Sequence, residues 1–275
     1  MPELPEVETV RRTLKTKIIN KKIIAVEIFY PNIIVEPSVE EFKKNLIFQT
    51  IMDIKRKGKW LMFELTDYYL LSHLRMEGKY NLKSINDKIE KHEHVNFIFD
   101  DNTCLRYKDT RKFGKMYLYS KDEVLNKKPL NELGLEPWDD NLNINYLKNK
   151  YTNKRLPIKT ILLDQGIITG IGNIYADEVL FGAKINPLKL GINITLEECQ
   201  RIVSSAKRII QEAIKYGGTT IKSYTSSLGV TGRFQEKLMV HKRENEKCKL
   251  CGTIIKRIVV GGRSTYYCEK CQKDS

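Results

Sequence analysis

The sequence lacks any long apolar run. Nowhere in its 275 residues is there a stretch that approaches the roughly 18 uncharged apolar positions that a membrane-spanning helix needs. Internal repeats and low-complexity tracts are also absent, and the opening Met1-Pro2-Glu3 is acidic at once, where a secretory signal would be basic and then apolar. These absences argue against a membrane-spanning helix and predict a globular protein of about two domains in the cytoplasm.

Cysteine is scarce and unevenly placed. Cys104 and Cys199 stand alone and are typical of small buried apolar residues. The other four follow the spacing C-x2-C-x16-C-x2-C, which is typical of a four-cysteine zinc site, whereas a pair of disulfides would suit a secreted protein. Four thiolates complete a tetrahedral shell around the ion, so the predicted zinc is structural and does not catalyse. The predicted ligands are Cys248, Cys251, Cys268 and Cys271.

Acidic residues are outnumbered by basic ones. The chain has 48 Lys and Arg against 34 Asp and Glu, a formal net charge of +14. Residues 231–275 contain 11 basic and 5 acidic residues, a surplus of six where an even spread would give about two. A basic domain is typical of a partner that is a polyanion, because each neutralised phosphate releases counterions. A solvated basic surface without a partner is the alternative.

Hydrophobic periodicity predicts a β-rich first half. Apolar residues at 7, 10, 14 and 18 form one face of a helix, with Pro5 suited to its first turn. Residues 22–119 then contain short alternating runs rich in Ile, Val, Phe and Tyr, which predict an antiparallel β-sandwich or barrel-like domain. We expect strands at 24–28, 60–65, 68–74, 95–99 and 116–119.

The second half is predicted to be helical. A polar, Asn-rich stretch follows residue 138, and the clearest helix begins at Thr195, where Glu198 completes a capping box, and stops at Gly217. Two shorter helices are expected near 161–163 and 174–181. The turn between them places Asn173 at a helix N-cap, where free N–H groups suit a phosphate. A tight turn between packed helices explains the same glycines equally well.

Two further residues could carry chemistry. Arg263 follows the hairpin turn signal Gly261-Gly262 inside the cysteine-rich segment, so a metal-held hairpin would present it to a DNA phosphate or minor groove. Pro2 becomes a secondary amine once Met1 is removed, and such an amine can attack a sugar C1′ as a lysine does in Schiff-base chemistry. Glu3 beside it could act as a general acid or base. Either feature alone is also common in proteins without such roles.

Besides the cysteine finger, four motifs stand out: residues 2–10 from Pro2 to Val10, His73-Leu74-Arg75-Met76-Glu77-Gly78, Asp109-Thr110-Arg111-Lys112-Phe113-Gly114, and Gly172-Asn173-Ile174-Tyr175-Ala176-Asp177-Glu178. With these motifs in this order, the sequence resembles the bacterial formamidopyrimidine-DNA glycosylases over its whole length. Leu4 in the opening is similar to this branch and unlike the related endonuclease VIII branch.

The resemblance implies a role for each matching residue. Pro2 would be the nucleophile, Glu3 the acid that assists sugar opening, and Lys59 and Arg263 further catalytic residues of a β-turn and of the finger. A lesion-capping loop would lie within residues 217–233, where the sequence departs most from the family pattern. The implied DNA contacts are His92, Arg111, Lys154, Lys159 and Asn173, and the implied fillers of the gap left by an extruded nucleotide are Met76, Arg111 and Phe113.

The implied fold is α+β: an N-terminal catalytic β-sandwich flanked by helices (1–135), a linker (136–150), a helix-two-turn-helix domain with the lesion loop (151–238) and a zinc-finger hairpin (239–275). The implied enzyme is a monomeric base excision repair glycosylase and lyase. It would remove oxidised purines, 8-oxoguanine and formamidopyrimidines, from double-stranded DNA through a proline Schiff base and β,δ-elimination. It would need one structural Zn²⁺, no soluble cofactor and no membrane, and would work at the bacterial nucleoid.

Three alternatives stay open. The chain could be a non-catalytic zinc-finger DNA-binding protein, or a zinc-ribbon subunit of a larger assembly, since both need the finger but not a free proline amine. It could also be a glycosylase with the preference of endonuclease VIII for oxidised pyrimidines.

Overall fold

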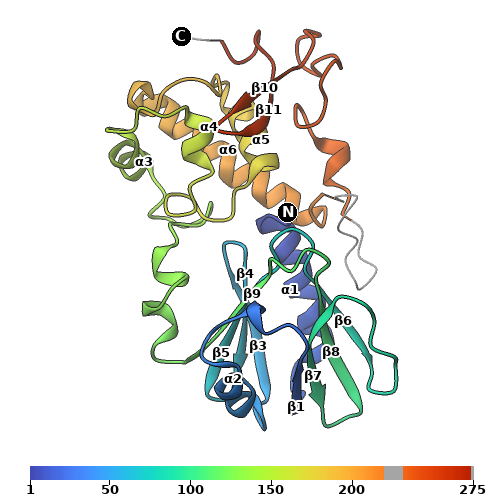
Figure 1. Ribbon diagram of the computed structural model, residues 1–275. Helices are drawn as coiled ribbons and strands as arrows, with labels where there is room; N and C mark the ends of the chain where they lie inside the picture. Colours follow the sequence, from blue (N-terminus) through green and yellow to red (C-terminus); the bar gives the residue numbers. More distant parts are fainter. Residues whose placement is uncertain (220–231, 274–275) are drawn as a thin grey trace. The chain divides into compact units, whose positions relative to one another are not determined.

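The computed structural model describes residues 1–219 and 232–273, and the chain divides into two compact units. The first unit contains residues 1–131 together with Thr219 and Gly232. The second contains residues 132–218 and continues from Arg233 (Figure 1). Among the described residues, no helix combines the length and apolarity needed to cross a bilayer.

The first unit is built on two β-sheets (Figure 1). Strand pairing is antiparallel throughout one sheet, and in the other only β2 runs parallel to its neighbour β9. The four-stranded sheet has the order β1 (Ile23–Ile28), β7 (Glu93–Phe99), β8 (Thr103–Lys108), β6 (Lys79–Ser84). The five-stranded sheet has the order β2 (Ile34–Glu36), β9 (Lys115–Ser120), β5 (Tyr68–His73), β4 (Trp60–Leu65), β3 (Ile51–Lys57).

The expected strands are therefore confirmed, with one difference. The parallel pairing of β2 departs from the predicted antiparallel arrangement. This strand of three residues follows the 3₁₀ turn η1 (Pro31–Ile33) and pairs with β9 at the edge of the sheet. Because a three-residue edge strand carries no clear alternation, its direction leaves no periodic signal in the sequence.

One apolar core joins the two sheets to two helices, α1 (Leu4–Ile18) and α2 (Val39–Leu46). The predicted apolar face of α1 is confirmed, since Val7, Val10, Leu14 and Ile18 are all buried in this core. Burying each such side chain stabilises the fold by roughly 1.5–3 kcal/mol. The amino-terminal helix is thus fixed to the sheets along its whole length, which places its first turn firmly in the first unit.

The second unit is mainly helical, as predicted. The capping box at the start of α6 is present, because Thr195 Oγ1 accepts the N–H of Glu198 at 3.1 Å and the Glu198 carboxylate accepts the N–H of Thr195 at 2.9 Å. α3 occupies the last part of the segment expected as a linker. The elements are α3 (Ile144–Tyr151), α4 (Ile158–Leu162), α5 (Asn173–Ala183), α6 (Leu196–Lys215), β10 (Lys256–Val260) and β11 (Arg263–Tyr267).

Among the described residues, further 3₁₀ turns follow β9, namely η2 (Val124–Asn126) and η3 (Leu130–Glu132), and lie in the second unit, namely η4 (Gly191–Asn193) and η5 (Phe234–Lys237). The helix α5 lies against α4, α6 and strand β11 (Figure 1). Eight of its eleven residues are buried. The sequence around Asn173 is therefore surrounded by packed elements of the second unit.

Candidate functional site

Pro2 and Glu3 directly precede α1, with Glu3 as its N-cap, and both are buried. The backbone N–H of Glu3 donates to the Glu6 carboxylate at 2.8 Å, as part of a capping box. The other Glu6 oxygen accepts the N–H of Thr219 at 2.8 Å and its hydroxyl at 3.1 Å. Glu6 thus fixes the turn that carries the predicted nucleophile. Sequence reasoning missed Glu6, although the three-residue spacing from Glu3 is the signal of a capping box.

Lys59 lies in the two-residue turn between β3 and β4, and it is buried. Gly58 precedes it with a φ of +58°, a conformation that favours glycine. Arg56 links this turn to α1, because its guanidinium donates to the Gly58 carbonyl at 2.8 Å and to the Glu8 carboxylate at 3.2 Å. The helix that carries Pro2 and the turn that carries Lys59 are therefore held together within the first unit.

Glu8 is the centre of that link. Although its burial opposes ionisation, hydrogen bonds and charges from arginines outweigh this and lower the pKa of Glu8 to about 2. Arg11 donates to both Glu8 oxygens, at 2.8 and 2.9 Å, and Arg12 donates to one of them at 2.8 Å. The carboxylate is therefore ionised at neutral pH, and Glu8 and Arg56 are two more residues that sequence reasoning missed.

His73 is the last residue of β5, and it lies close to this turn because it pairs with Trp60, the first residue of β4. The two rings meet edge to face with centroids 4.7 Å apart. Burial, with the positive charges of Arg75 and Lys59, lowers the pKa of His73 to about 3. The imidazole is therefore neutral at pH 7, and its Nδ1 accepts the N–H of Arg75 at 2.9 Å.

The predicted gap-filling residues lie on two loops of the first unit. Met76 is half-buried in the loop between β5 and β6, while Arg111 and Phe113 are exposed in the loop between β8 and β9. The Arg111 guanidinium lies 4.8 Å from the centroid of the Phe113 ring, a cation–π contact. His92, half-buried with a φ of +72°, precedes β7.

The second unit corrects the expected N-cap. Gly172, not Asn173, caps α5, and Asn173 is the first helical residue. The Asn173 side-chain Nδ2 donates to the carbonyl of Ser264 in β11 at 2.9 Å. The amide therefore joins the helix to the hairpin in place of capping α5. Asn173 thus connects α5 to the strand that begins with Arg263.

Lys159 is buried inside the second unit, whereas a direct contact with DNA would require an exposed side chain. Its side chain is 0% exposed, its Nζ donates to the Asn173 carbonyl at 3.0 Å, and it forms an ion pair with Asp177. The other Asp177 carboxylate oxygen lies 2.6 Å from Nδ1 of the buried His241. A buried ammonium in this cluster supports the start of α5 from within the unit. Lys154, by contrast, is half-exposed, 3.5 Å from Asp164.

Glu178, the neighbour of Asp177, is also buried and was not singled out from the sequence. Its carboxylate accepts the backbone N–H groups of Met239, Val240 and His241 at 2.8–3.0 Å. Burial nevertheless raises the pKa of Glu178 above its ordinary value. The segment that leads into the finger is therefore held to α5 through one carboxyl group.

The four predicted zinc ligands converge. Their Sγ atoms all lie within 4.8 Å of one another, with Cys248 to Cys271 at 3.9 Å and Cys251 to Cys268 at 3.4 Å. A tetrahedral ion with Zn–S distances of about 2.3 Å requires sulfurs about 3.8 Å apart. The four cysteines therefore fit zinc, and the ion would hold the base of the hairpin without an open position for a substrate.

The hairpin above this cluster turns at Gly261 and Gly262. Both glycines have positive φ, +55° and +72°, which suits a tight two-residue turn. A Cβ added at Gly261 would lie 2.7 Å from Thr160 Oγ1, so a side chain there would collide with α4. Arg263 follows the turn and is exposed, as predicted.

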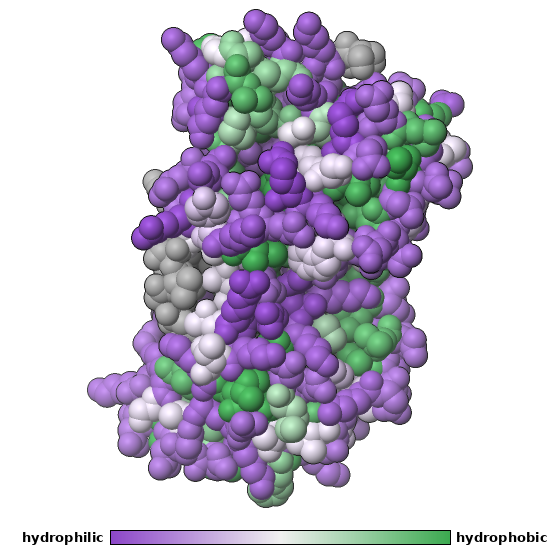
Figure 2. All heavy atoms as spheres, turned by 180° about the vertical axis from the view of Figure 1, so that it is seen from behind, coloured by the Kyte–Doolittle hydropathy of each residue, from purple (hydrophilic) through white to green (hydrophobic). Residues whose placement is uncertain are grey.

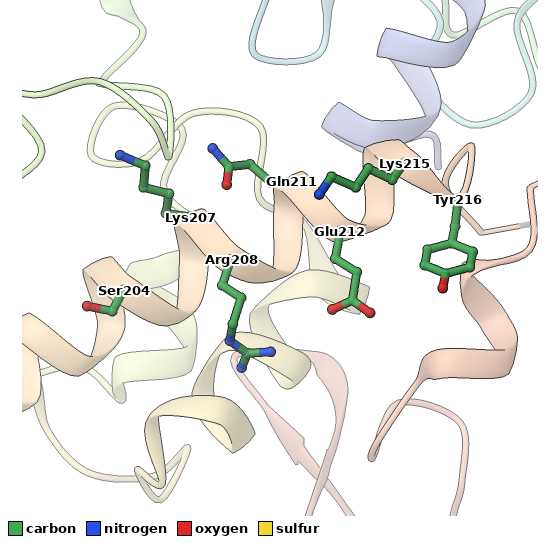
Figure 3. A pocket seen from close by; sticks show the side chains of 7 residues that line it. All are labelled: Ser204, Lys207, Arg208, Gln211, Glu212, Lys215 and Tyr216. Carbon is green, nitrogen blue, oxygen red and sulfur yellow. The ribbon is translucent and has the colours of Figure 1, made fainter.

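The outer face of α6 forms an open groove of about 680 Å³. Figure 3 shows polar side chains projecting from this helix, among them Lys207, Arg208 and Lys215. None of the predicted catalytic, DNA-binding or metal-binding residues lines this groove. On the face drawn in Figure 2, hydrophilic residues cover most of the surface and apolar ones form smaller groups.

Comparison with known proteins agrees with this geometry. A family model described as the formamidopyrimidine-DNA glycosylase N-terminal domain matches residues 1–116, its H2TH domain matches residues 133–225, and a zinc finger found in FPG and IleRS matches residues 245–273. The chain belongs to the formamidopyrimidine-DNA glycosylase family. The predicted enzyme class, a DNA glycosylase of base excision repair, is thereby confirmed, as are the α+β fold and the zinc finger.

Individual relatives match over nearly the whole chain. The formamidopyrimidine-DNA glycosylases of Oceanobacillus iheyensis and Bacillus anthracis are each 48% identical, covering 99% of this chain and 98% and 99% of the relatives. The Lactococcus lactis enzyme in a complex with DNA containing an abasic site has a TM-score of 0.92 and 42% identity, covering 99% of this chain and 100% of that one. The same enzyme with DNA containing N7-benzyl-Fapy-dG gives the same values.

Proposed function

We propose that this glycosylase removes oxidised purines from damaged double-stranded DNA and cuts the strand through a Schiff base on the Pro2 amine. The observation that supports the proposal is that hydrogen bonds within the first unit fix the turn of Pro2 and connect it to the turn of Lys59. Glu6 fixes the turn that carries the proline, and Glu8 and Arg56 tie the same helix to the turn of Lys59. Relatives of this family bind DNA with Fapy-dG analogues and abasic sites, as their names state.

The reaction begins when the Pro2 nitrogen, free once Met1 is removed, attacks the sugar C1′. The glycosidic bond breaks, and the damaged base leaves with a proton. A proton delivered to the ring oxygen by Glu3 opens the sugar, and the nitrogen lone pair completes an iminium at C1′. This cation withdraws electrons from C2′, which then loses a proton.

Loss of that proton expels the 3′ phosphate, and a second elimination expels the 5′ phosphate. Water finally hydrolyses the iminium and regenerates the amine. Lys59 and Arg263 carry positive charges that would offset the charge on the phosphates as they leave. Lys59 is held in a rigid turn, and Arg263 stands on a hairpin fixed at its base.

Binding would divide between the two units. His92 and Arg111 in the first unit and Lys154 and Asn173 in the second are proposed contacts to the DNA backbone. Lys159 acts through Asn173, because its buried ammonium holds the Asn173 carbonyl. Met76, Arg111 and Phe113 are proposed to fill the gap left by the extruded nucleotide. The proposed lesion-capping loop lies mostly outside the described residues.

Zinc, bound by the four cysteines, would hold the finger and take no part in the reaction. The functional segments would be the catalytic domain (1–135), linker (136–150), DNA-binding domain (151–238) and finger (239–275), in a monomer acting at the bacterial nucleoid. A second candidate substrate is an oxidised pyrimidine, because one Lactococcus lactis relative is named in a complex with DNA that contains such a lesion.

Borohydride trapping tests the proposal. A duplex with 8-oxoguanine opposite cytosine is incubated with zinc-loaded protein and borohydride, and a parallel duplex carries an oxidised pyrimidine. We expect a covalent complex in the first case, mapped by peptide mass spectrometry to Pro2. In a parallel reaction without borohydride, where the iminium is left to eliminate, we expect DNA ends with phosphates on both sides of the gap. A trapped complex on the pyrimidine duplex alone would favour the second candidate, and trapping at a lysine would contradict the proline mechanism.

A further inference from the structure

Asp109 lies at the start of the loop that carries Arg111 and Phe113, and its side chain is 0% exposed. One carboxylate oxygen accepts the N–H of Arg111 at 3.0 Å. The other accepts the N–H groups of Phe113 at 2.9 Å and Gly114 at 2.8 Å. A single buried carboxylate therefore binds the backbone of this loop at three points.

The backbone of Asp109 is fixed as firmly as its side chain. Its N–H donates to the carbonyl of His92 at 3.0 Å, and its carbonyl lies 2.8 Å from Nε2 of His94. The following Lys112 adopts a φ of +57°, which few side chains adopt without support. The loop is thus built in one conformation from both ends, while the Phe113 side chain stays 49% exposed at its tip.

The hydroxyl of Tyr107 connects this loop with the loop of Met76. Tyr107 is 0% exposed, and its hydroxyl lies 3.5 Å from the Asp109 carboxylate. A Cβ added at Gly114 would lie 1.9 Å from this hydroxyl oxygen, and one added at Gly78 would lie 2.3 Å from it. Both glycines therefore let their loops approach the same buried oxygen more closely than any other residue could.

We infer that Asp109, together with the Tyr107 hydroxyl, is a positioning residue that sets Arg111, Phe113 and Met76 for insertion into the DNA duplex. The inference rests on the proposed function of these three side chains. A wedge that must hold two strands apart gains from being ordered before it meets DNA, because no ordering cost is then added to the cost of unstacking. Asp109 itself faces away from solvent and acts only through the loop.

The test uses the variant Asp109→Asn, which keeps the size of the side chain but replaces one accepting oxygen with an amide that cannot accept. Each protein acts on two substrates: a duplex with 8-oxoguanine opposite cytosine, and a single-stranded oligonucleotide with an abasic site, which has no partner strand to hold apart. We expect the rate on the duplex to fall about tenfold to a hundredfold, since small misplacements of positioning groups cost this much. The single-stranded rate should stay within twofold.

Asp87→Asn is the matched control, because its exposed carboxylate also accepts a backbone N–H, that of Ser84 at the end of β6, at 3.0 Å. It should leave both rates unchanged. Combining Asp109→Asn with Phe113→Ala should cost less than the two single losses combined, since part of the effect of Asp109 passes through Phe113. If Asp109→Asn fails to fold, Gly114→Ala decides, and it should show the same split between substrates.

Equal losses on both substrates, or additive losses in the double variant, would overturn the positioning role. The proposed function fails in a different way. In that case the parent protein itself would neither excise the lesion nor cut the abasic strand, whatever the residue at position 109.

Discussion

The turn that carries Pro2 and the hairpin that carries Arg263 are held in place by different means. The turn belongs to a helix whose apolar face is buried in the large core of the first unit, and carboxylates fix its first residues. The hairpin rests on a small cluster that includes Cys248 and Cys268 themselves. The sheets and helices of the first unit thus need no metal, whereas the finger depends on one. Removal of the metal should therefore unfold the finger alone, and changes to the carboxylates near Pro2 should act on the first unit alone.

The largest effect is expected from loss of the metal. Zinc binding contributes about 10–16 kcal/mol to the folding of such small domains, far more than the small cluster of the finger can replace. Cys268→Ser or chelation should therefore abolish DNA binding and unfold the finger, while the sheets of the first unit keep their thermal transition. Circular dichroism, zinc content and gel shift measure these three quantities.

Cys199→Ala is the control for this experiment, since Cys199 is a buried cysteine outside the metal cluster. It should retain zinc and DNA binding. Unchanged DNA affinity in protein shown to be free of zinc would contradict a structural role for the metal.

The next largest effect concerns Glu3 in the first unit. Glu3→Gln removes the proposed acid, and general acid catalysis is worth about 10²- to 10⁴-fold, so excision of 8-oxoguanine should fall within that range. Cleavage at a preformed abasic site should change little, because its sugar already offers an open aldehyde and needs no proton from Glu3 to open the ring. Glu40→Gln, in the exposed first turn of α2, is the matched control. Equal loss of both activities with DNA binding intact would refute the assigned role of Glu3.

Two lysines of the second unit distinguish a structural role, expected for the buried Lys159, from a direct contact with DNA, expected for the half-exposed Lys154. Lys159→Met leaves Asp177 buried without its cation, which should lower the free energy of unfolding of this unit by about 3–5 kcal/mol. Lys154→Ala removes a half-exposed pair and should cost at most about 1 kcal/mol. It should instead lower the dependence of DNA binding on salt by about one charge. Urea denaturation and salt titrations would measure both, and the reverse pattern would show that Lys159 is the direct contact.

A smaller effect, about 2 kcal/mol between pH 6.5 and 5, is expected from a pH dependence in the first unit. Burial lowers the pKa of His73 in the folded state to about 3, so the unfolded chain binds a proton below about pH 6.5 that the folded chain does not. Stability from this residue is present above pH 6.5 and is lost as the pH falls toward 3, by up to about 1.4 kcal/mol per unit.

Between pH 6.5 and 5, the loss of stability from His73 can be told apart from that of Glu8. Because the pKa of Glu8 is about 2 in the folded state, the stability that Glu8 contributes is lost only as the pH falls below about 4.5. His73→Asn should flatten the dependence of the unfolding free energy in that interval more than His92→Asn does, because the pKa of His92 is also lowered but at a half-exposed position. An unchanged slope in His73→Asn would show that this imidazole is not held neutral.

Periodic segments were predictable from the sequence, and contacts between distant segments were not. The apolar face of α1 and the Thr195 capping box are local patterns, and the cysteine spacing defines a metal site by itself. β3 and β6 escaped prediction because charged residues interrupt their alternation. The burial of Lys159 was not predictable, because a lysine carries no sign in the sequence of whether it meets solvent or a buried carboxylate. Asp109 and Glu6 act on backbone N–H groups that only the folded loop brings to them.

The central claim is that the amine of Pro2 does the chemistry. As long as Met1 is attached, the Pro2 nitrogen is an amide without a nucleophilic lone pair. Two preparations of the full-length, zinc-loaded protein should be compared, one with Met1 removed and one with Met1 retained throughout, each verified by intact mass spectrometry. The measurement is borohydride trapping on a duplex with 8-oxoguanine. We predict a covalent complex only where Met1 is absent, with equal DNA affinity in both preparations. Equal trapping by the protein that retains Met1 would contradict the account.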